Sequence, residues 1–206
     1  MQKEISTRDK VLYFSKQEFL QRGFINASLR NIATSAGMTT GAIYTYFKDK
    51  NALFEAIVDP VCNQIENILA QLSESYYKND EIVSFIDTHK SLEDLYTIYE
   101  YIYKNFDIFR LLVVGAEGSS KSGFIHTIVD LEVKHTLAYL EVFSKKKKRD
   151  YKINVSTIHA ISESYINSLL EPVRHNMSYE EAVDNIDLLV TFYTGGWQSF
   201  IKKLFP

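Results

Sequence analysis

Apolar residues recur along this chain with the three- and four-residue spacing of amphipathic helices, and strand-like alternation never extends beyond a few residues. The first apolar stripe predicts a helix from near Thr7 to Arg22. Its expected buried side consists of Val11, Leu12, Phe19 and Leu20. With only three prolines and eight glycines to interrupt helices, the pattern predicts an all-α protein.

Further helices follow from the same spacing and from the residues that break it. A fourth helix is expected from near Asp49 or Asn51 to about Tyr77. Pro60 falls inside it, where a proline removes one backbone hydrogen bond and bends a helix. Asn79-Asp80 marks a break. The later elements are expected to be a helix over residues 81–105 with an interruption near Lys90-Ser91, a short helix from Asp107 to about Val114, a loop over 115–123, a long helix over 124–147, and two last helices, Asn154 to about His175 and Ser178 to Phe205, separated by Asn176.

Residues 28–50 have the spacing of a helix-turn-helix. Ser28 is a natural N-cap for a short helix, and Gly37 suits the left-handed position that ends it. Thr39 or Thr40 then begins a second helix, whose first residues are small or carry hydroxyl groups. Such a helix fits the major groove of DNA as a recognition helix. The residues expected to face inward are Ile32, Ala33, Ala36, Ile43 and Phe47.

Charge is distributed unevenly along the chain. Residues 1–50 contain eight basic and four acidic side chains, a net charge of +4, whereas the whole chain carries −3 and the remainder therefore −7. A basic N-terminal region joined to an acidic body is typical of a polyanion-binding module fused to another domain. We expect a DNA-binding domain over residues 1–48 and a second, helical domain over residues 49–206.

A series of short motifs at fixed spacings runs through residues 5–58. They are Val11-Leu12, Phe19, Gly23-Phe24, Ile32-Ala33, Ala36-Gly37-Met38, Gly41-Ala42-Ile43-Tyr44, Tyr46-Phe47, Lys50 and Leu53. This pattern resembles the TetR family of bacterial one-component regulators. Ala27 stands where the family usually has a hydroxyl residue, and Met38 where Val is common. The other three quarters of the chain carry no motif, so there the resemblance extends to architecture only.

The resemblance implies a dimeric, ligand-responsive transcriptional regulator, most often a repressor, that binds a pseudo-palindromic operator. Arg30 either reads a guanine edge with two hydrogen bonds or contacts a phosphate. Tyr44 either contacts a phosphate or buries its ring in the core of the head. By resemblance, Tyr44 and Lys50 are the strongest phosphate candidates. The residues expected to contact double-stranded DNA are Ser28, Arg30, Thr39, Thr40, Gly41, Ala42, Tyr44, Tyr46, Lys48 and Lys50.

The last two helices have apolar residues on more than one side, which indicates either a dimer interface or a monomer core. Gly195-Gly196 in mid-helix favours a close helix crossing. In the resembled family these two helices form the dimer bundle. The interface is expected to include Ile158, Ile161, Tyr165, Leu169, Tyr193 and Trp197.

Aromatic residues are dense between residues 76 and 124, as in a core or around a small-molecule pocket. The polar groups expected to orient an unknown effector there are Tyr99, Tyr103, His126 and His135. Each of them is alternatively a core residue. The five histidines show no metal-ligand spacing, and we expect neither a metal nor a cofactor.

Two other segments suggest functions that their context disfavours: residues 115–122 suggest phosphate binding, and residues 145–149 suggest binding to nucleic acid or a membrane. Residues 115–122 nearly form a phosphate-binding loop, but Ser120 stands where that motif requires Gly before the Lys, so a phosphotransferase is disfavoured. The cations of residues 145–149 complement the dipole at a helix C-terminus. A remaining alternative is a DNA-bound scaffold without an effector.

The compartment follows from the cysteine count and the N-terminal sequence. The single Cys62 excludes an internal disulfide and fits a reducing cytoplasm. No apolar run approaches membrane-spanning length, and the first residues lack the apolar segment of a signal peptide, so we expect a cytoplasmic protein without a membrane partner.

Overall fold

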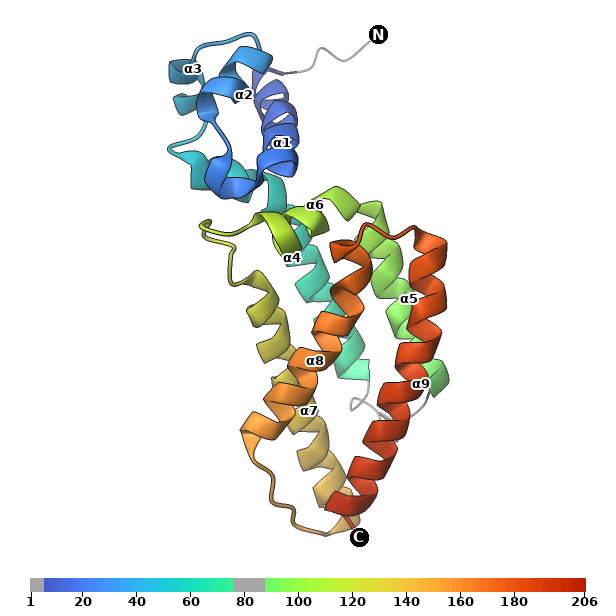
Figure 1. Ribbon diagram of the computed structural model, residues 1–206. Helices are drawn as coiled ribbons and strands as arrows, with labels where there is room; N and C mark the ends of the chain where they lie inside the picture. Colours follow the sequence, from blue (N-terminus) through green and yellow to red (C-terminus); the bar gives the residue numbers. More distant parts are fainter. Residues whose placement is uncertain (1–5, 76–87) are drawn as a thin grey trace. The chain divides into compact units, whose positions relative to one another are not determined.

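The computed structural model describes residues 6–75 and 88–206, and the backbone of these residues forms helices and no β-strand (Figure 1). The all-α prediction is confirmed. None of the helices in these ranges is long and apolar enough to cross a membrane. In chain order the elements are α1 (Thr7–Asn26), α2 (Leu29–Ser35), α3 (Thr40–Tyr44), α4 (Lys50–Ser75), α5 (Thr88–Lys104), α6 (Phe106–Arg110), the π-helical turn η1 (Leu111–Gly115), α7 (Phe124–Lys147), α8 (Val155–Arg174) and α9 (Tyr179–Leu204).

The chain divides into two compact units. The first contains the described residues up to Gln64 together with Asn105–Ile125, and the second contains the described residues of Ile65–Lys104 and His126–Pro206. Helix α4 therefore contributes residues to both units. The expected DNA-binding domain, residues 1–48, falls within the first unit, and its boundary after residue 48 stays a prediction.

Most helix ends follow local capping signals. The Ser6 hydroxyl accepts the N–H of Asp9 at the start of α1, and Asn154 accepts the N–H of Ser156 at the start of α8. At the start of α9, Ser178 forms a capping box with an acidic residue three positions later. The predicted helices over residues 124–147 and over the last two segments are therefore confirmed.

The fourth helix begins at Lys50, next to its expected start, whereas one expectation for the fifth helix fails. Pro60 lies inside α4 as expected. The predicted interruption near Lys90-Ser91 is wrong, because α5 runs through both residues. The expected end of the fourth helix near Tyr77, the break at Asn79-Asp80 and the start of the next helix lie outside the described residues.

The core of the first unit is aromatic. The rings of Phe19, Phe24 and Phe54 pack against one another with centroids between 5.1 and 5.9 Å apart. These residues come from the middle of α1, from its end and from α4, so one cluster holds the two longest helical segments of the unit together. Ile32 and Ile43 complete this core from α2 and α3.

Burial along α1 follows a four-residue period. Val11, Ser15 and Phe19 are buried, whereas Leu12 and Leu20, which we expected on the buried side, are only partly covered. Ser15 is tolerated in the stripe because its hydroxyl donates to the Val11 carbonyl at 2.6 Å. The first helix was therefore predicted correctly, but its most buried face contains Ser15 in place of the expected Leu12 and Leu20.

Residues 105–125 belong to the first unit although they follow α5. The Lys16 ammonium on α1 lies 2.7 Å from the Asp107 carboxylate on α6. In the following loop, the Ser120 N–H donates to the Asn51 side chain on α4 at 3.0 Å, and Lys121 pairs with Asp59 at 2.6 Å. The segment before this loop is helical rather than a strand, so a phosphate-binding loop is excluded.

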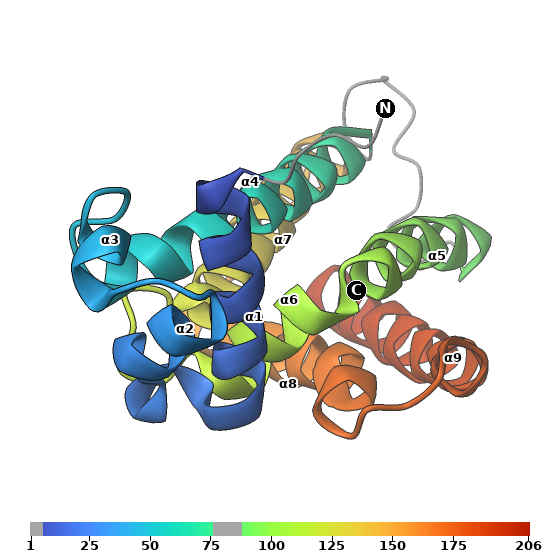
Figure 2. The same ribbon diagram turned by 90° about the horizontal axis from the view of Figure 1, so that it is seen from above.

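Helices α5, α8 and α9 pack side by side in the second unit, with α9 between the other two (Figure 2). The inner face of α9 follows helical spacing and consists of Ala182, Ile186, Val190, Thr194 and Ile201. The loop between α8 and α9 contains Asn176 at a φ of 54°, a left-handed position that suits asparagine. The expected separation of these two helices at Asn176 is confirmed.

The cationic run of residues 145–149 ends α7. Three of its lysines occupy the last helical turn, and all five side chains are exposed. Lys145 pairs with Glu141 at 2.7 Å one turn earlier, and the pKa of the Glu141 carboxyl is lowered by this hydrogen bond. This arrangement is that of cations at a helix C-terminus.

Candidate nucleic-acid interface

The turn between α2 and α3 is built around one glycine. Gly37 has a φ of 69°, and the N–H of Met38 returns to the Ala33 carbonyl at 2.9 Å. A residue with a side chain rarely adopts this conformation, which explains why glycine ends the first helix of the motif. The helix-turn-helix predicted from the sequence is therefore present, with α2 and α3 joined by a tight turn.

The first residues of α3 are accessible. The Thr39 hydroxyl accepts the N–H of Ala42 at 3.2 Å, so Thr39 and not Thr40 is the N-cap. Gly41 is exposed, and a β-carbon placed on it would have only the Thr39 hydroxyl oxygen nearby, at 3.7 Å. Because Gly41 adds no side chain to this surface, a double helix can approach the backbone of α3 closely.

Two tyrosines project from the end of α3 and from the turn that follows it. The side chains of Tyr44 and Tyr46 are 52% and 47% exposed, while Ile43 and Phe47 beside them are buried. The alternative that Tyr44 buries its ring in the core of the head is therefore wrong. Both rings lie where they can contact DNA, as the phosphate interpretation requires.

Arg30 on α2 and Lys48 after α3 are exposed cations. Among the described residues, neither side chain has a hydrogen bond or an ion pair. An arginine without an internal partner can direct its guanidinium to a base edge or to a phosphate, and a lysine can contact a phosphate. Their base or phosphate roles stay predictions.

Lys50 differs from these two cations. Its ammonium donates to the carbonyl oxygens of Phe24, Ile25 and Ala27 at 2.7, 3.1 and 3.2 Å. It also lies 4.6 Å from the centroid of the Phe24 ring. A lysine ammonium has three N–H donors, and here all three have partners within the protein.

Ser28 and the start of α2 are held by an acidic residue of α1. The Ser28 hydroxyl accepts the N–H of Asn31, and the Ser28 N–H donates to the Glu18 carboxylate at 3.1 Å. Glu18 also accepts from the Asn31 amide at 3.2 Å and pairs with Arg22 at 3.2 Å. The expected N-cap is confirmed, and Glu18 positions α2 against α1.

Sequence reasoning missed Glu18 and also Arg8. The Arg8 guanidinium lies over the Phe47 ring, 5.4 Å from its centroid, which places a cation of α1 beside the end of the recognition segment. Arg8 and Phe47 are far apart in the sequence, and Glu18 is ten residues from Ser28. No local pattern connects these pairs, so only the three-dimensional structure could reveal them.

The expected effector-binding tyrosines have structural partners. The Tyr99 hydroxyl, which is buried, donates to the Leu169 carbonyl, and burial raises the pKa of Tyr99. The Tyr103 hydroxyl lies 3.1 Å from the Met177 carbonyl oxygen and 3.0 Å from that of Ser178. Burial and the nearby acidic residues of α9 raise the pKa of Tyr103. Both tyrosines thus fasten α5 to the end of α8 and the loop that follows it.

The two histidines expected in the effector pocket, His126 and His135, differ in their exposure to solvent. His126 at the start of α7 is exposed, whereas His135 is half-buried, and its burial lowers the pKa of its imidazole. Within the described ranges, no three His, Cys, Asp or Glu side chains are arranged to hold a metal ion. The assignment of all four residues to an effector pocket stays a prediction.

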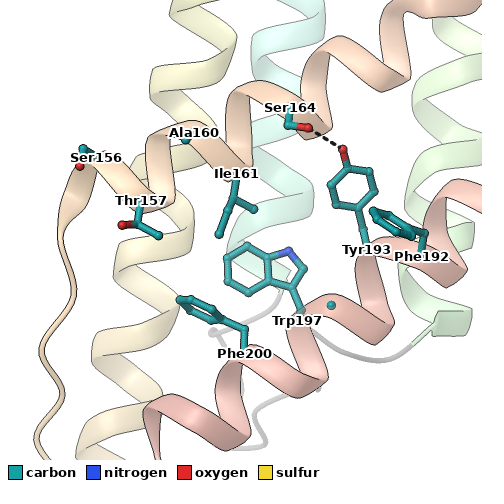
Figure 3. Close-up of a pocket in the computed structure, with 10 residues that line it drawn as sticks. Ser156, Thr157, Ala160, Ile161, Ser164, Phe192, Tyr193, Trp197 and Phe200 are labelled. Atoms are coloured by element: carbon teal, nitrogen blue, oxygen red, sulfur yellow. Dashed lines mark hydrogen bonds between the residues drawn. The ribbon is translucent and has the colours of Figure 1, made fainter.

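The residues expected at a dimer interface divide into two groups. Ile158 and Leu169 are buried in the second unit. The other four, namely Ile161, Tyr165, Tyr193 and Trp197, are partly exposed, and three of them line an open groove of about 620 Å³ between α8 and α9 (Figure 3). We refer to this feature as the α8–α9 groove. Its full lining is Ser156, Thr157, Ala160, Ile161, Ser164, Phe192, Tyr193, Gly196, Trp197 and Phe200.

The α8–α9 groove is lined by four aromatic residues together with aliphatic and hydroxyl-bearing ones. The indole of Trp197 lies 5.2 Å from the ring of Phe200, and Tyr193 lies 4.8 Å from Tyr165. The Tyr193 hydroxyl is 3.1 Å from that of Ser164, as Figure 3 shows. The aromatic rings are thus held in place within one chain and leave an apolar concave surface.

Comparison with known proteins agrees with this architecture. A family model described as "Bacterial regulatory proteins, tetR family" matches residues 15–57. The HTH-type transcriptional repressor BepR of Brucella suis is 37% identical over 73 residues, which span 35% of this chain and 35% of BepR. The uncharacterized HTH-type transcriptional regulator YdgC of Bacillus subtilis is 25% identical over 144 residues, 63% of this chain and 74% of YdgC.

A solved structure extends the likeness in fold to nearly the whole chain. It is that of a TetR-like transcriptional regulator from Rhodococcus sp. RHA1, which superposes with a TM-score of 0.62 at 16% identity over 95% of this chain and 100% of that one. The likeness at this identity concerns the fold, and the family-model match concerns the N-terminal head with its helix-turn-helix. The head of the chain, residues 15–57, matches the TetR family of bacterial regulatory proteins, and the chain as a whole shares the fold of a TetR-like regulator.

Proposed function

We propose that the protein is a ligand-responsive repressor that binds a pseudo-palindromic operator as a homodimer. The observation that carries the proposal is the exposed surface of the helix-turn-helix. The Gly37 turn fixes α2 against α3, and Arg30 of α2, Tyr44 of α3 and Lys48 of the segment after α3 are exposed to solvent. Cations and tyrosine hydroxyls on a fixed helical pair can hold phosphates while the first residues of α3 meet base edges.

Within this surface the proposed roles differ. Arg30 reads a base, because a guanidinium without an internal partner can donate two hydrogen bonds to guanine. Lys48, Tyr44 and Tyr46 contact phosphates and set the register. Gly41 permits close approach at the start of α3. Ser28 and Thr39 act through their helices, since their hydroxyls are used as N-caps.

The α8–α9 groove supports the homodimer. Phe192 and Leu188 on α9 are 74% and 73% exposed, which is unusual for large apolar side chains of a monomer. A β-carbon placed on Gly195 or Gly196 would meet nothing within 4 Å, so these glycines serve no packing need within the chain. Pairing of two such faces about a twofold axis would cover the groove and present two heads to half-sites about 34–36 Å apart, or a multiple of that distance.

The effector is proposed to bind in the second unit, among its aromatic residues. Its binding would favour a dimer whose heads do not match the operator spacing, with a coupling free energy of typically 1–3 kcal/mol. Helix α4 connects the units covalently and would carry the change. The repressive sign is supported by BepR, which is named a repressor. Because its target is bacterial DNA, the protein is proposed to act in the cytoplasm.

The test is selection of binding sites from a randomised duplex library, followed by titrations at several salt concentrations. We expect a pseudo-palindromic site, dimers on DNA and steeply salt-dependent affinity. Arg30→Ala should weaken the cognate site by about 1–3 kcal/mol and relax preference at one base pair, whereas Lys48→Ala should weaken all sequences alike and lower the salt slope by about 1. A protein that stays monomeric and selects no site would refute the proposal.

A further inference from the structure

The Lys50 ammonium sits on the carbonyl oxygens that follow the interruption of α1. Gly23 has a φ of 67°, so the regular hydrogen bonding of α1 stops there and the chain makes a turn through residues 24–27 before α2 begins. Carbonyl groups at the end of a helix lack intrahelical partners and need donors from elsewhere. Lys50, the first residue of α4, supplies three of these hydrogen bonds, at 2.7 to 3.2 Å.

The same short segment is held from its other side by Glu18. The Ser28 N–H donates to the Glu18 carboxylate at 3.1 Å, while the carbonyl of the preceding residue, Ala27, accepts from Lys50. The connection between α1 and α2 is thus fixed by one charged residue through its carbonyls and by another through an N–H. A cation near the ring of Phe24, itself part of the aromatic core, adds to the attachment.

We propose that Lys50 is a positioning residue of the DNA-binding head and that its ammonium does not bind a phosphate. It fastens the end of α1 to the start of α4 and thereby holds α2 in register for α3. A direct phosphate contact would require the ammonium to leave three carbonyl oxygens, which would then be without their charged donor. This inference concerns how the proposed DNA-binding surface is held, and in that respect it rests on the proposed function.

Hydrogen exchange of the full-length protein without DNA tests the structural part of the inference. Lys50→Met keeps the aliphatic stem and removes the ammonium, and we expect amide exchange over residues 24–31 to accelerate by at least about tenfold, which corresponds to about 1.4 kcal/mol. Lys48→Met is the matched control, since Lys48 is an exposed lysine two positions away without a described side-chain partner, and exchange over residues 24–31 should not change. Unchanged exchange in Lys50→Met overturns the inference.

Salt-dependent titration on the selected operator tests the other part. The affinity for duplex DNA falls as salt rises, and removing a lysine that binds one phosphate lowers the magnitude of the slope of log affinity against log salt by about 0.9. We expect Lys50→Met to weaken all DNA sequences with an unchanged slope, and Lys48→Met to lower the slope. A slope lowered by about 0.9 in Lys50→Met overturns the inference even if exchange accelerates.

Lys50→Arg keeps the positive charge and changes the geometry of the hydrogen-bond donors. It also tests the inference if Lys50→Met does not fold. Arginine binds phosphate at least as well as lysine, but its planar fork cannot direct three donors at these three carbonyls in the same way. Faster exchange and weaker binding at an unchanged salt slope support the positioning role, whereas wild-type exchange and affinity overturn it. If the wild-type protein binds no DNA, the proposed function fails, and the exchange comparison still decides whether Lys50 holds the segment.

Discussion

The glycine pair of α9 gives a prediction in which monomer stability and dimer affinity change in opposite directions. Gly195 and Gly196 lie inside a helix of 26 residues, where each glycine is less favourable than alanine by about 0.8–1.0 kcal/mol. A β-carbon on either one would meet nothing within 4 Å in the same chain. Replacing both with alanine should therefore stabilise the isolated chain by about 2 kcal/mol.

The expected effect on the dimer follows from the neighbours of these glycines. Leu188, Phe192 and Gly195 are spaced four and three residues apart, so they share one face of α9, and Gly196 lines the α8–α9 groove. If this surface meets a second copy closely, four added methyl groups overpack the twofold contact at about 1–3 kcal/mol. The dissociation constant of the dimer should rise by about 5- to 150-fold.

The measurement combines sedimentation equilibrium with denaturant unfolding at a protein concentration at which both proteins are monomeric. Gln198→Ala is the control, because Gln198 is an exposed residue of the same helix that does not line the α8–α9 groove. It should change neither the dissociation constant nor, beyond a few tenths of a kcal/mol, the stability. A double alanine variant that is more stable and dimerises as well as the wild type would show that no close contact forms at these glycines.

Three further predictions concern single positions. Gly37→Ala should destabilise the first unit by about 1–2 kcal/mol, because a φ of 69° is strained for alanine even though no atom lies within 4 Å of the added carbon. Thermal unfolding and amide hydrogen exchange over α2 and α3 measure this loss. Burial raises the pKa of the Glu132 carboxyl above its usual value. The stability that this group contributes is therefore fully present below its unfolded-state pKa and is lost as pH rises through its folded-state pKa. Urea unfolding should show that Glu132→Gln is more stable than the wild type at about pH 7 and has no such advantage at about pH 3. Pro60→Ala should restore one backbone hydrogen bond of α4 and leave the dimer intact while changing the ratio of operator affinities with and without effector; an unchanged ratio would leave Pro60 with no part in the response.

The elements were predictable where their signals are local. Ser28, Gly37 and Ser178 mark helix ends through hydrogen bonds or backbone angles within a few residues, and those ends agree with the structure. The interruption expected at Lys90-Ser91 failed because polar residues alone do not end a helix, which requires a cap or a change of backbone angle. Local polarity alone was an insufficient signal there.

The sequence indicated where the candidate site lies, but it did not indicate which contacts each of its side chains makes. Arg30 and Lys48 were expected as exposed cations, and they are exposed, whereas the sequence left open whether the ring of Tyr44 is buried. Lys50 looked equivalent to Lys48, yet its partners lie 23 to 26 residues earlier in the chain. Likewise, the Tyr103 hydroxyl meets carbonyls more than 70 residues later. Such roles depend on tertiary packing, which spacing along the sequence does not contain.

The discontinuity of the first unit has a consequence for its biosynthesis. α1 meets its partners on residues 105–125 only after the chain has passed through the start of the second unit. At about 5–20 residues per second, the ribosome needs roughly 3–12 s between adding Gln64 and adding Ile125. During this interval the nascent unit exposes surface that it later covers. For the same reason, a hybrid regulator that takes its first unit from this chain needs three junctions, one within α4 after Gln64, one between Lys104 and Asn105, and one after Ile125.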